Sequence, residues 1–214
     1  MRHPEPVPAA DADADERAGS ADAVVWARLR LSDPNALTEV FDRYARPVYN
    51  FAFRRTASWA SADDVTQATF VTVWRRAAAQ DLPPLEHPTA LPWLLGVADR
   101  ESRGVIRSLG RRRRLQQRLD SVGQTDPFEA DHADEVTDRL DDERRMAQVR
   151  DAVRVLPDHQ RVVVELVVWT GLSLAEAATA LGVAEGTVKS RLSRARARLG
   201  EQLGPASDLS LEER

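Results

Sequence analysis

The stretch with the clearest chemistry lies near the carboxyl end and reads GLSLAEAATALGVAEGTVKSRLSRARARL, residues 171–199. Its second part carries one lysine and several arginines on a frame of alanine and leucine. Permanent positive charges bind phosphates, and short polar side chains beside them can reach the edges of bases. The residue types therefore predict DNA binding, with no residue assigned to catalysis.

Two short helices around a tight turn are expected to position these side chains. Ser173 and Glu176 form an S-x-x-E capping box at the start of the first helix. Gly182 supplies the sharp turn, and Val183 can fill the angle between the helices. This order of signals predicts a helix-turn-helix.

The second helix has a buried stripe and a polar outer face. At about 100° per residue, the stripe collects Val188, Leu192, Ala195 and Leu199, and polar side chains including Arg194 point away from it. The alternative is a solvated helix of a bundle whose arginines only cover the surface. The cap, the turn, the stripe and the basic face occur together, which favours DNA binding.

Composition limits the classes of protein. The chain has 214 residues, 43% of them apolar and 30% charged, and no cysteine, which excludes disulfides and thiol chemistry. No apolar run approaches the roughly 20 residues of a membrane helix, and the first residues lack the apolar centre of a secretory signal. We expect a cytoplasmic protein without membrane insertion.

Charge is segregated along the chain. The net charge of −4 argues weakly against a nucleic-acid partner. However, residues 103–118 hold seven arginines and no acid, whereas residues 126–143 hold nine acids and one arginine. Local fields therefore matter more than the total.

Helical periodicity predicts an all-α fold of two small helical domains joined by a flexible acidic linker, the second domain containing the helix-turn-helix. Pro47 is expected to end or kink a helix, Ser61 to cap the next one, and the proline-rich residues 81–92 to form a loop. The run RVVVELVVW is assigned to a helix. The predicted boundaries are a disordered acidic tail 1–21, a domain 22–118, a linker 119–143, a domain 144–204 and a tail 205–214.

Two strings resemble a known family. LPDHQRVVVEL followed by the helix-turn-helix, above all GTVKSRLSRAR at residues 186–196, is similar to the carboxyl-terminal domain of bacterial sigma factors of the extracytoplasmic-function (ECF) branch. DVTQATFVTVW at residues 64–74 resembles the amino-terminal pattern D-x-x-Q-E-T-F-x-x-x-W of the same family. The resemblance covers residues 25–200.

The resemblance implies a detachable, non-enzymatic subunit that lends promoter recognition and strand opening to core RNA polymerase. The first domain corresponds to sigma region 2 and the second to sigma region 4. The implied partners are core RNA polymerase, promoter DNA and an anti-sigma protein, with no cofactor and no metal. The implied contacts are Asp64 and Gln67 to the polymerase clamp, Arg100, Arg103 and Arg107 to the −10-type element, and Thr187, Lys189, Ser190, Arg191 and Arg194 to the −35-type element.

The chain departs from the family pattern at three positions, because Ala68, Arg100 and Gly104 stand where Glu, Asn and Asp are common. These departures keep open a second function, a helix-turn-helix regulator that binds operator DNA without joining core polymerase. The residues give no support to an enzyme, since no glycine-rich phosphate loop and no metal-ligand spacing is present.

Overall fold

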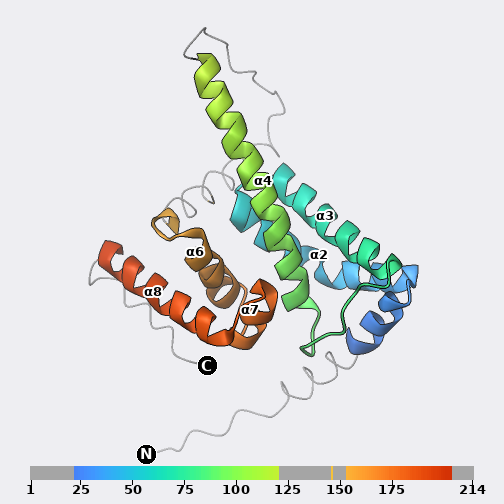
Figure 1. Ribbon diagram of the computed structural model, residues 1–214. Helices are drawn as coiled ribbons and strands as arrows, with labels where there is room; N and C mark the ends of the chain where they lie inside the picture. The colour runs from blue at the N-terminus through green and yellow to red at the C-terminus, as the bar shows by residue number, and fades with distance from the viewer. Residues whose placement is uncertain (1–21, 121–145, 147–152, 204–214) are drawn as a thin grey trace, which may run out of the picture.

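Helices make up the whole of the regular structure in the part of the chain that the computed structural model describes, residues 22–120, 146 and 153–203 (Figure 1). The prediction of an all-α fold is confirmed. A helix at 22–30 precedes the amino-terminal helices α2 (Pro34–Thr56), α3 (Trp59–Ala78) and α4 (Leu91–Asp120). The carboxyl-terminal elements are η1 (Val153–Val155), α6 (Asp158–Val164), η2 (Glu165–Trp169), α7 (Leu174–Leu181) and α8 (Glu185–Leu203).

Most of the predicted domain boundaries lie outside the described residues and stay predictions. Helix α4 runs to Asp120, two residues beyond the predicted domain end at 118. The predicted tails 1–21 and 205–214 and the linker from residue 121 onward lie outside the described residues. We call residues 22–120 the amino-terminal half and residues 153–203 the carboxyl-terminal half.

Pro47, which was predicted to end or kink a helix, does not end helix α2. Asp33 caps this helix by accepting a hydrogen bond from the Asn35 amide (2.9 Å), and the helix continues through Pro47 to Thr56. A proline inside a helix costs about 3 kcal/mol because one backbone hydrogen bond is lost. Val48 and Phe51 follow it and are fully buried, so their packing offsets that cost.

Two other predicted helix ends are also shifted. Helix α3 begins at Trp59, and its cap is Ser58, whose hydroxyl accepts a hydrogen bond from the Ser61 amide, so Ser61 is not the cap. Helix α4 begins at Leu91, which places Pro92 in its first turn and not in the loop. Proline fits there because amides of the first turn have no acceptor within the helix.

The apolar run in the carboxyl-terminal half is helical, as predicted. Helix α6 covers Asp158–Val164 and passes directly into the π-helical turn η2, with Val162, Val163 and Leu166 buried. The single acid of this run, Glu165, is also buried, with 1% of its surface exposed. A buried carboxylate needs partners, and these come from the other half.

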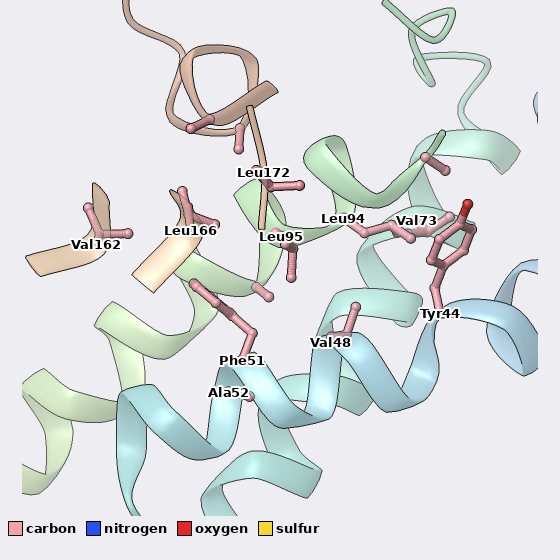
Figure 2. Close-up of a cluster of buried hydrophobic side chains, with 14 of the residues drawn as sticks. Tyr44, Val48, Phe51, Ala52, Val73, Leu94, Leu95, Val162, Leu166 and Leu172 are labelled. Atoms are coloured by element: carbon pink, nitrogen blue, oxygen red, sulfur yellow. The ribbon is translucent and has the colours of Figure 1, made fainter. Parts of the chain in front are cut away.

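The two halves share one hydrophobic core. Figure 2 shows Phe51 of α2 and Leu95 of α4 in the same buried cluster as Leu166 and Leu172 of the carboxyl-terminal half. Helix α7 lies against α4, and the approach is closest at Gly96. A Cβ atom added there would lie 2.3 Å from the carbonyl oxygen of Ala180, so only glycine fits this crossing.

A cluster of buried charges lies at the interface between the halves. Arg55 of α2 is 2% exposed and donates hydrogen bonds to Glu165 (2.9 Å) and to Asp158 (3.1 Å). Its guanidinium also lies 3.1 Å from Asp99 of α4, and Arg103 lies 2.6 Å from the other oxygen of Asp99. We call these five residues the Arg55 cluster. Its ion pairs connect α2 and α4 with α6 and η2.

The Arg55 cluster holds three carboxylates and two guanidiniums, so it carries one excess negative charge. Burial raises the pKa of the Glu165 carboxyl to about 7, although Arg55 opposes the shift. Burial likewise raises the pKa of Asp99. Of the charged neighbours, Arg55 and Arg161 lower the pKa of Glu165 and Asp158 raises it. The cluster therefore favours binding a proton near neutral pH.

This predicts a pH dependence of folding. The unfolded Glu165 loses its proton near pH 4.5 and the folded one near pH 7. Between these values the folded chain binds more protons, so the free energy of unfolding falls as the pH rises, by about 3 kcal/mol in all. Urea unfolding of Glu165→Gln from pH 5 to pH 8 is expected to show a much weaker slope than the unsubstituted chain. Glu201→Gln, at an exposed glutamate of α8, keeps the slope, and equal slopes in all three proteins would contradict the assignment.

Candidate nucleic-acid and polymerase interfaces

The helix-turn-helix forms with the predicted cap and turn. The Ser173 hydroxyl accepts a hydrogen bond from the Glu176 amide (3.2 Å), and the Glu176 carboxylate accepts one from the Ser173 amide (2.8 Å). Gly182 adopts a left-handed conformation (φ 63°) at the end of α7, and the Val183 amide donates to the Ala178 carbonyl (3.1 Å). These local bonds fix the direction in which α8 leaves the turn.

Helix α8 has the predicted buried stripe. Val188, Leu192 and Ala195 are buried, and Leu199 packs at the edge of the core. On the remaining surface Lys189 and Arg194 are exposed, whereas Thr187, Ser190 and Arg191 are half-buried. The five residues predicted to contact the −35-type element therefore all lie outside the stripe and are accessible, at least in part, to a partner.

The cations of α8 are free to bind an anion. Within the described ranges no carboxylate lies within 4.0 Å of the charged groups of Lys189, Arg191 or Arg194. Two further arginines of α8, Arg196 and Arg198, are exposed and also have no such partner among the described residues. The sequence analysis missed Arg198, although its i, i+4 spacing from Arg194 places both on neighbouring turns of one face.

The three arginines predicted for the −10-type element differ in their surroundings. Arg100 and Arg107 are exposed on α4. Arg103 is partly buried, with 42% of its side chain exposed, and it lies between Asp99 of its own helix (2.6 Å) and Asp158 of α6 (3.6 Å). The carboxyl-terminal half thus occupies one of the three predicted DNA contacts.

The predicted polymerase contacts lie on α3. Asp64 and Gln67 are both exposed, as a protein contact requires. Gln67 also borders a groove between α2 and α3 with a volume of about 680 Å³. Residue 68, the alanine that departs from the family pattern, is half-buried beside it.

The groove is mostly apolar. Phe41 and Phe70 meet edge to face in it, with ring centroids 4.8 Å apart, and Leu37, Val71 and Trp74 complete its apolar lining. Phe41 and Val71 are 44% and 48% exposed. Phe41 has helical spacing from Val40 and Tyr44, but those two side chains are buried whereas Phe41 is not.

Candidate metal ligands do not cluster in the described part of the chain. No group of three His, Asp or Glu side chains there is arranged to hold a metal ion. His87 instead contacts the Thr179 hydroxyl of α7 (2.8 Å). None of the described helices has the length and apolar character needed to cross a membrane.

The sequence analysis also missed the Arg55 cluster. One signal was present in the sequence, because Glu165 is the only acid in the run VVVELVV and an acid in an apolar helix needs a partner. The partner itself was not visible, since Arg55 lies 110 positions earlier in the chain.

Comparison with known protein families gives a match for each half of the chain, and curated proteins match across both halves. Residues 40–114 match the family described as "Sigma-70 region 2", and residues 146–199 match "Sigma-70, region 4". The ECF RNA polymerase sigma factor SigL of Mycobacterium tuberculosis is 34% identical over 156 residues, which cover 72% of this chain and 80% of SigL. SigM of the same species is 33% identical over 184 residues, covering 86% of this chain and 85% of SigM.

Two solved structures share the fold. CnrH, solved in complex with the cytosolic domain of CnrY, superimposes with a TM-score of 0.61 at 24% identity, covering 87% of this chain and 99% of CnrH. RpoE of Bartonella quintana, solved with the anti-sigma factor NepR, gives a TM-score of 0.52 at 26% identity, covering 79% of this chain and 98% of RpoE. With the two region matches and the similarity to SigL and SigM, the chain belongs to the ECF RNA polymerase sigma factors.

Proposed function

We propose that this sigma factor directs core RNA polymerase to promoters through three surfaces, one for the enzyme and two for DNA. Residues 22–118 act as region 2, which binds core polymerase and opens the −10-type element, and residues 144–204 act as region 4, which reads the −35-type element. The observation that carries the proposal is the accessible cationic face of α8, which a capped helix-turn-helix presents without carboxylate partners among the described residues.

The upstream element is read by α8. Arg194 lies on the side of the helix away from the buried stripe, where a guanidinium can donate two hydrogen bonds to a guanine edge. Ser190 lies one turn earlier on the same side, and its hydroxyl donates to the Thr187 carbonyl (3.0 Å), which leaves its lone pairs available. Lys189, Arg191 and Thr187 flank this centre and position the helix through phosphates.

The downstream element is held by α4. Arg100 and Arg107 are exposed at i, i+7 spacing and can bind phosphates of the opening duplex. Arg103 lies between them in sequence but is paired with Asp99 and Asp158, so it contributes less free positive charge to this face. Since Arg100 replaces the more usual asparagine, its role here is a charge contact and not a base-specific one.

Core polymerase binds the face formed by α2 and α3. Asp64 and Gln67 supply polar contacts, and the groove lined by Phe41, Val71 and Trp74 supplies apolar area beside them. One acidic side chain, Asp63, lines the groove, and both Asp63 and the neighbouring Asp64 are exposed. An apolar helix face with a basic group beside it would complement this surface, and we assign the contact to the clamp coiled coil of the largest polymerase subunit.

An inhibitory partner is also part of the proposal. RpoE of Bartonella quintana was solved with an anti-sigma factor, and an anti-sigma protein of this chain would cover the same polymerase and DNA surfaces. The proposed place of action is the cytoplasm, where polymerase and promoter DNA are found, and the proposed role is binding without catalysis.

The first prediction concerns base reading by Arg194. Arg194→Ala is expected to reduce, by about tenfold, the preference of the holoenzyme for an intact upstream element over a scrambled one, since one bidentate base contact is worth about 1–3 kcal/mol. Transcript yield from the two templates gives the ratio.

Arg196→Ala provides the matched control for this ratio. It removes the same charge from an exposed position at the edge of the buried stripe, so it should weaken both templates equally and leave the ratio unchanged. An unchanged ratio in Arg194→Ala would rule out base reading by this residue.

The second prediction concerns the groove. Val71→Asp places a charge in the apolar lining at a position that is 48% exposed, so the fold should tolerate it while core binding weakens by at least about tenfold. Val24→Asp is the control, because Val24 is 60% exposed on helix 22–30 and does not line the groove. Labelled chain titrated with sigma-free core polymerase reports the affinity, and equal affinities of the two variants would refute this docking face.

A further inference from the structure

Lysine occurs once in this chain, on the helix that is proposed to bind the upstream element. The chain has 30 lysines and arginines, and Lys189 of α8 is the only lysine among them. An arginine makes the stronger phosphate contact, because its planar guanidinium can donate two parallel hydrogen bonds. A phosphate contact therefore does not by itself require an ammonium group at this position.

A primary amine offers a reaction that a guanidinium does not. The guanidinium stays protonated and delocalised at physiological pH, so it has no free electron pair to attack an acyl carbon. The unprotonated fraction of a lysine amine has such a pair, and acylation of the amine removes its positive charge. Beside the α-amino group, Lys189 is the one amine of this chain that an acyl donor can modify.

The surroundings of Lys189 leave its amine open. The side chain is exposed, and no carboxylate of the described residues lies within 4.0 Å of its Nζ. Gly186, at i−3, has no side chain, and nothing lies within 4 Å of a Cβ added there. Ser193, at i+4, is small and exposed. A donor can therefore approach the amine along the helix surface from both directions.

The charges around Lys189 favour an anionic donor. Arg196 lies at i+7 and hence on the same side of α8, and it is exposed, as is Arg194. Glu185, at i−4, is the one acid within a turn of Lys189 on this helix. A surface with excess positive charge raises the local concentration of small anions. The charges that are proposed to bind DNA phosphates thus also attract an acyl donor that carries phosphate.

We propose that Lys189 is a regulatory acylation site for an acyl donor that carries phosphate, and that acylation weakens the binding of α8 to DNA. The unprotonated Nζ attacks the acyl carbon, a C–N bond forms, and the bond from that carbon to the oxygen or sulfur of the donor breaks. The electron pair of that bond and a proton from Nζ leave with the phosphate or thiol, so the step needs no oxidant or reductant. The effect on DNA rests on the proposed function of α8, whereas the reactive site does not.

The rate of acylation gives the first measurement. The full chain is incubated with acetyl phosphate or with acetyl-coenzyme A, and acylation is located by peptide mass mapping. The control Lys189→Arg/Arg46→Lys moves the single lysine to an exposed position of α2, where the neighbour at i−4 is the exposed Asp42. With at least one donor, Lys189 is expected to react at least about threefold faster than the lysine of the control, and added salt should remove the difference. Equal or slower acylation of Lys189 with both donors would overturn the site.

DNA binding gives the second measurement. The full chain, acylated and freed of donor, is titrated into a fluorescein-labelled duplex of random sequence at several salt concentrations. Because one charge is lost, the slope of log affinity against log salt should fall by about one, and the affinity at 0.1 M salt by about eightfold. Lys189→Gln carries a neutral amide and should show the same loss without any donor. In Lys189→Arg, donor treatment should change neither quantity, although the α-amino group still reacts.

Protection by DNA separates a failure of the site from a failure of the proposed function. A duplex at about ten times its Kd should slow acylation of Lys189 about tenfold and leave the lysine of the double variant unprotected. Fast acylation without protection, together with an unchanged salt slope, would overturn the regulatory effect and the proposed DNA contact of Lys189. Slow acylation, together with a reduced salt slope in Lys189→Gln, would overturn the acylation site and support the DNA contact.

Discussion

Arg55 carries a permanent positive charge and is almost completely buried. The arrangement of the two halves follows from the carboxylates that must surround this charge. A guanidinium cannot lose its proton to escape desolvation, so it requires carboxylates on several sides. Asp99 of α4 comes from its own half, whereas Glu165 and Asp158 come from the other half. Breaking one of these pairs leaves the others with an uncompensated buried charge, which makes the cluster act as a unit. The relative placement of α2, α4 and α6 depends on it.

The cluster also leaves α4 and α8, the two helices proposed to bind DNA, in different electrostatic states. Arg103 is drawn into the cluster by Asp99 and Asp158, so α4 has part of its positive charge neutralised. The cations of α8 have no such partner among the described residues and stay open. An overall charge of −4 is compatible with DNA binding because the positive charge is concentrated on these helices.

Local features of the carboxyl-terminal half could be predicted because their signals lie within a few residues of one another. The Ser173–Glu176 capping box, the left-handed Gly182 and the buried stripe of α8 each depend on contacts along one helix or one turn. Features of the amino-terminal half were harder to predict from the sequence. Pro47 was expected to end or kink α2, but the helix continues through it, and burial of Val48 and Phe51 outweighs one missing hydrogen bond. Helical spacing relates Phe41 to the buried Val40 and Tyr44, but spacing alone does not show that Phe41 stays 44% exposed.

Contacts between distant residues could not be predicted from one sequence. The pairing of Arg55 with Glu165 joins positions 110 residues apart, and no spacing rule relates them. The same is true of Gly96, whose role comes from a helix that crosses it from the other half. As a result, Arg103 was correctly placed on α4 by its spacing, while its ion pair with Asp158 was not anticipated.

The central claim is that this chain gives core RNA polymerase a promoter preference. The most direct measurement mixes the full chain with sigma-free core polymerase and fragmented genomic DNA, and maps the 5′ ends of the transcripts by sequencing. The account predicts discrete start sites preceded by one shared two-part motif, absent when the chain is omitted. Transcripts without a shared motif, or start sites that do not depend on the chain, would contradict it.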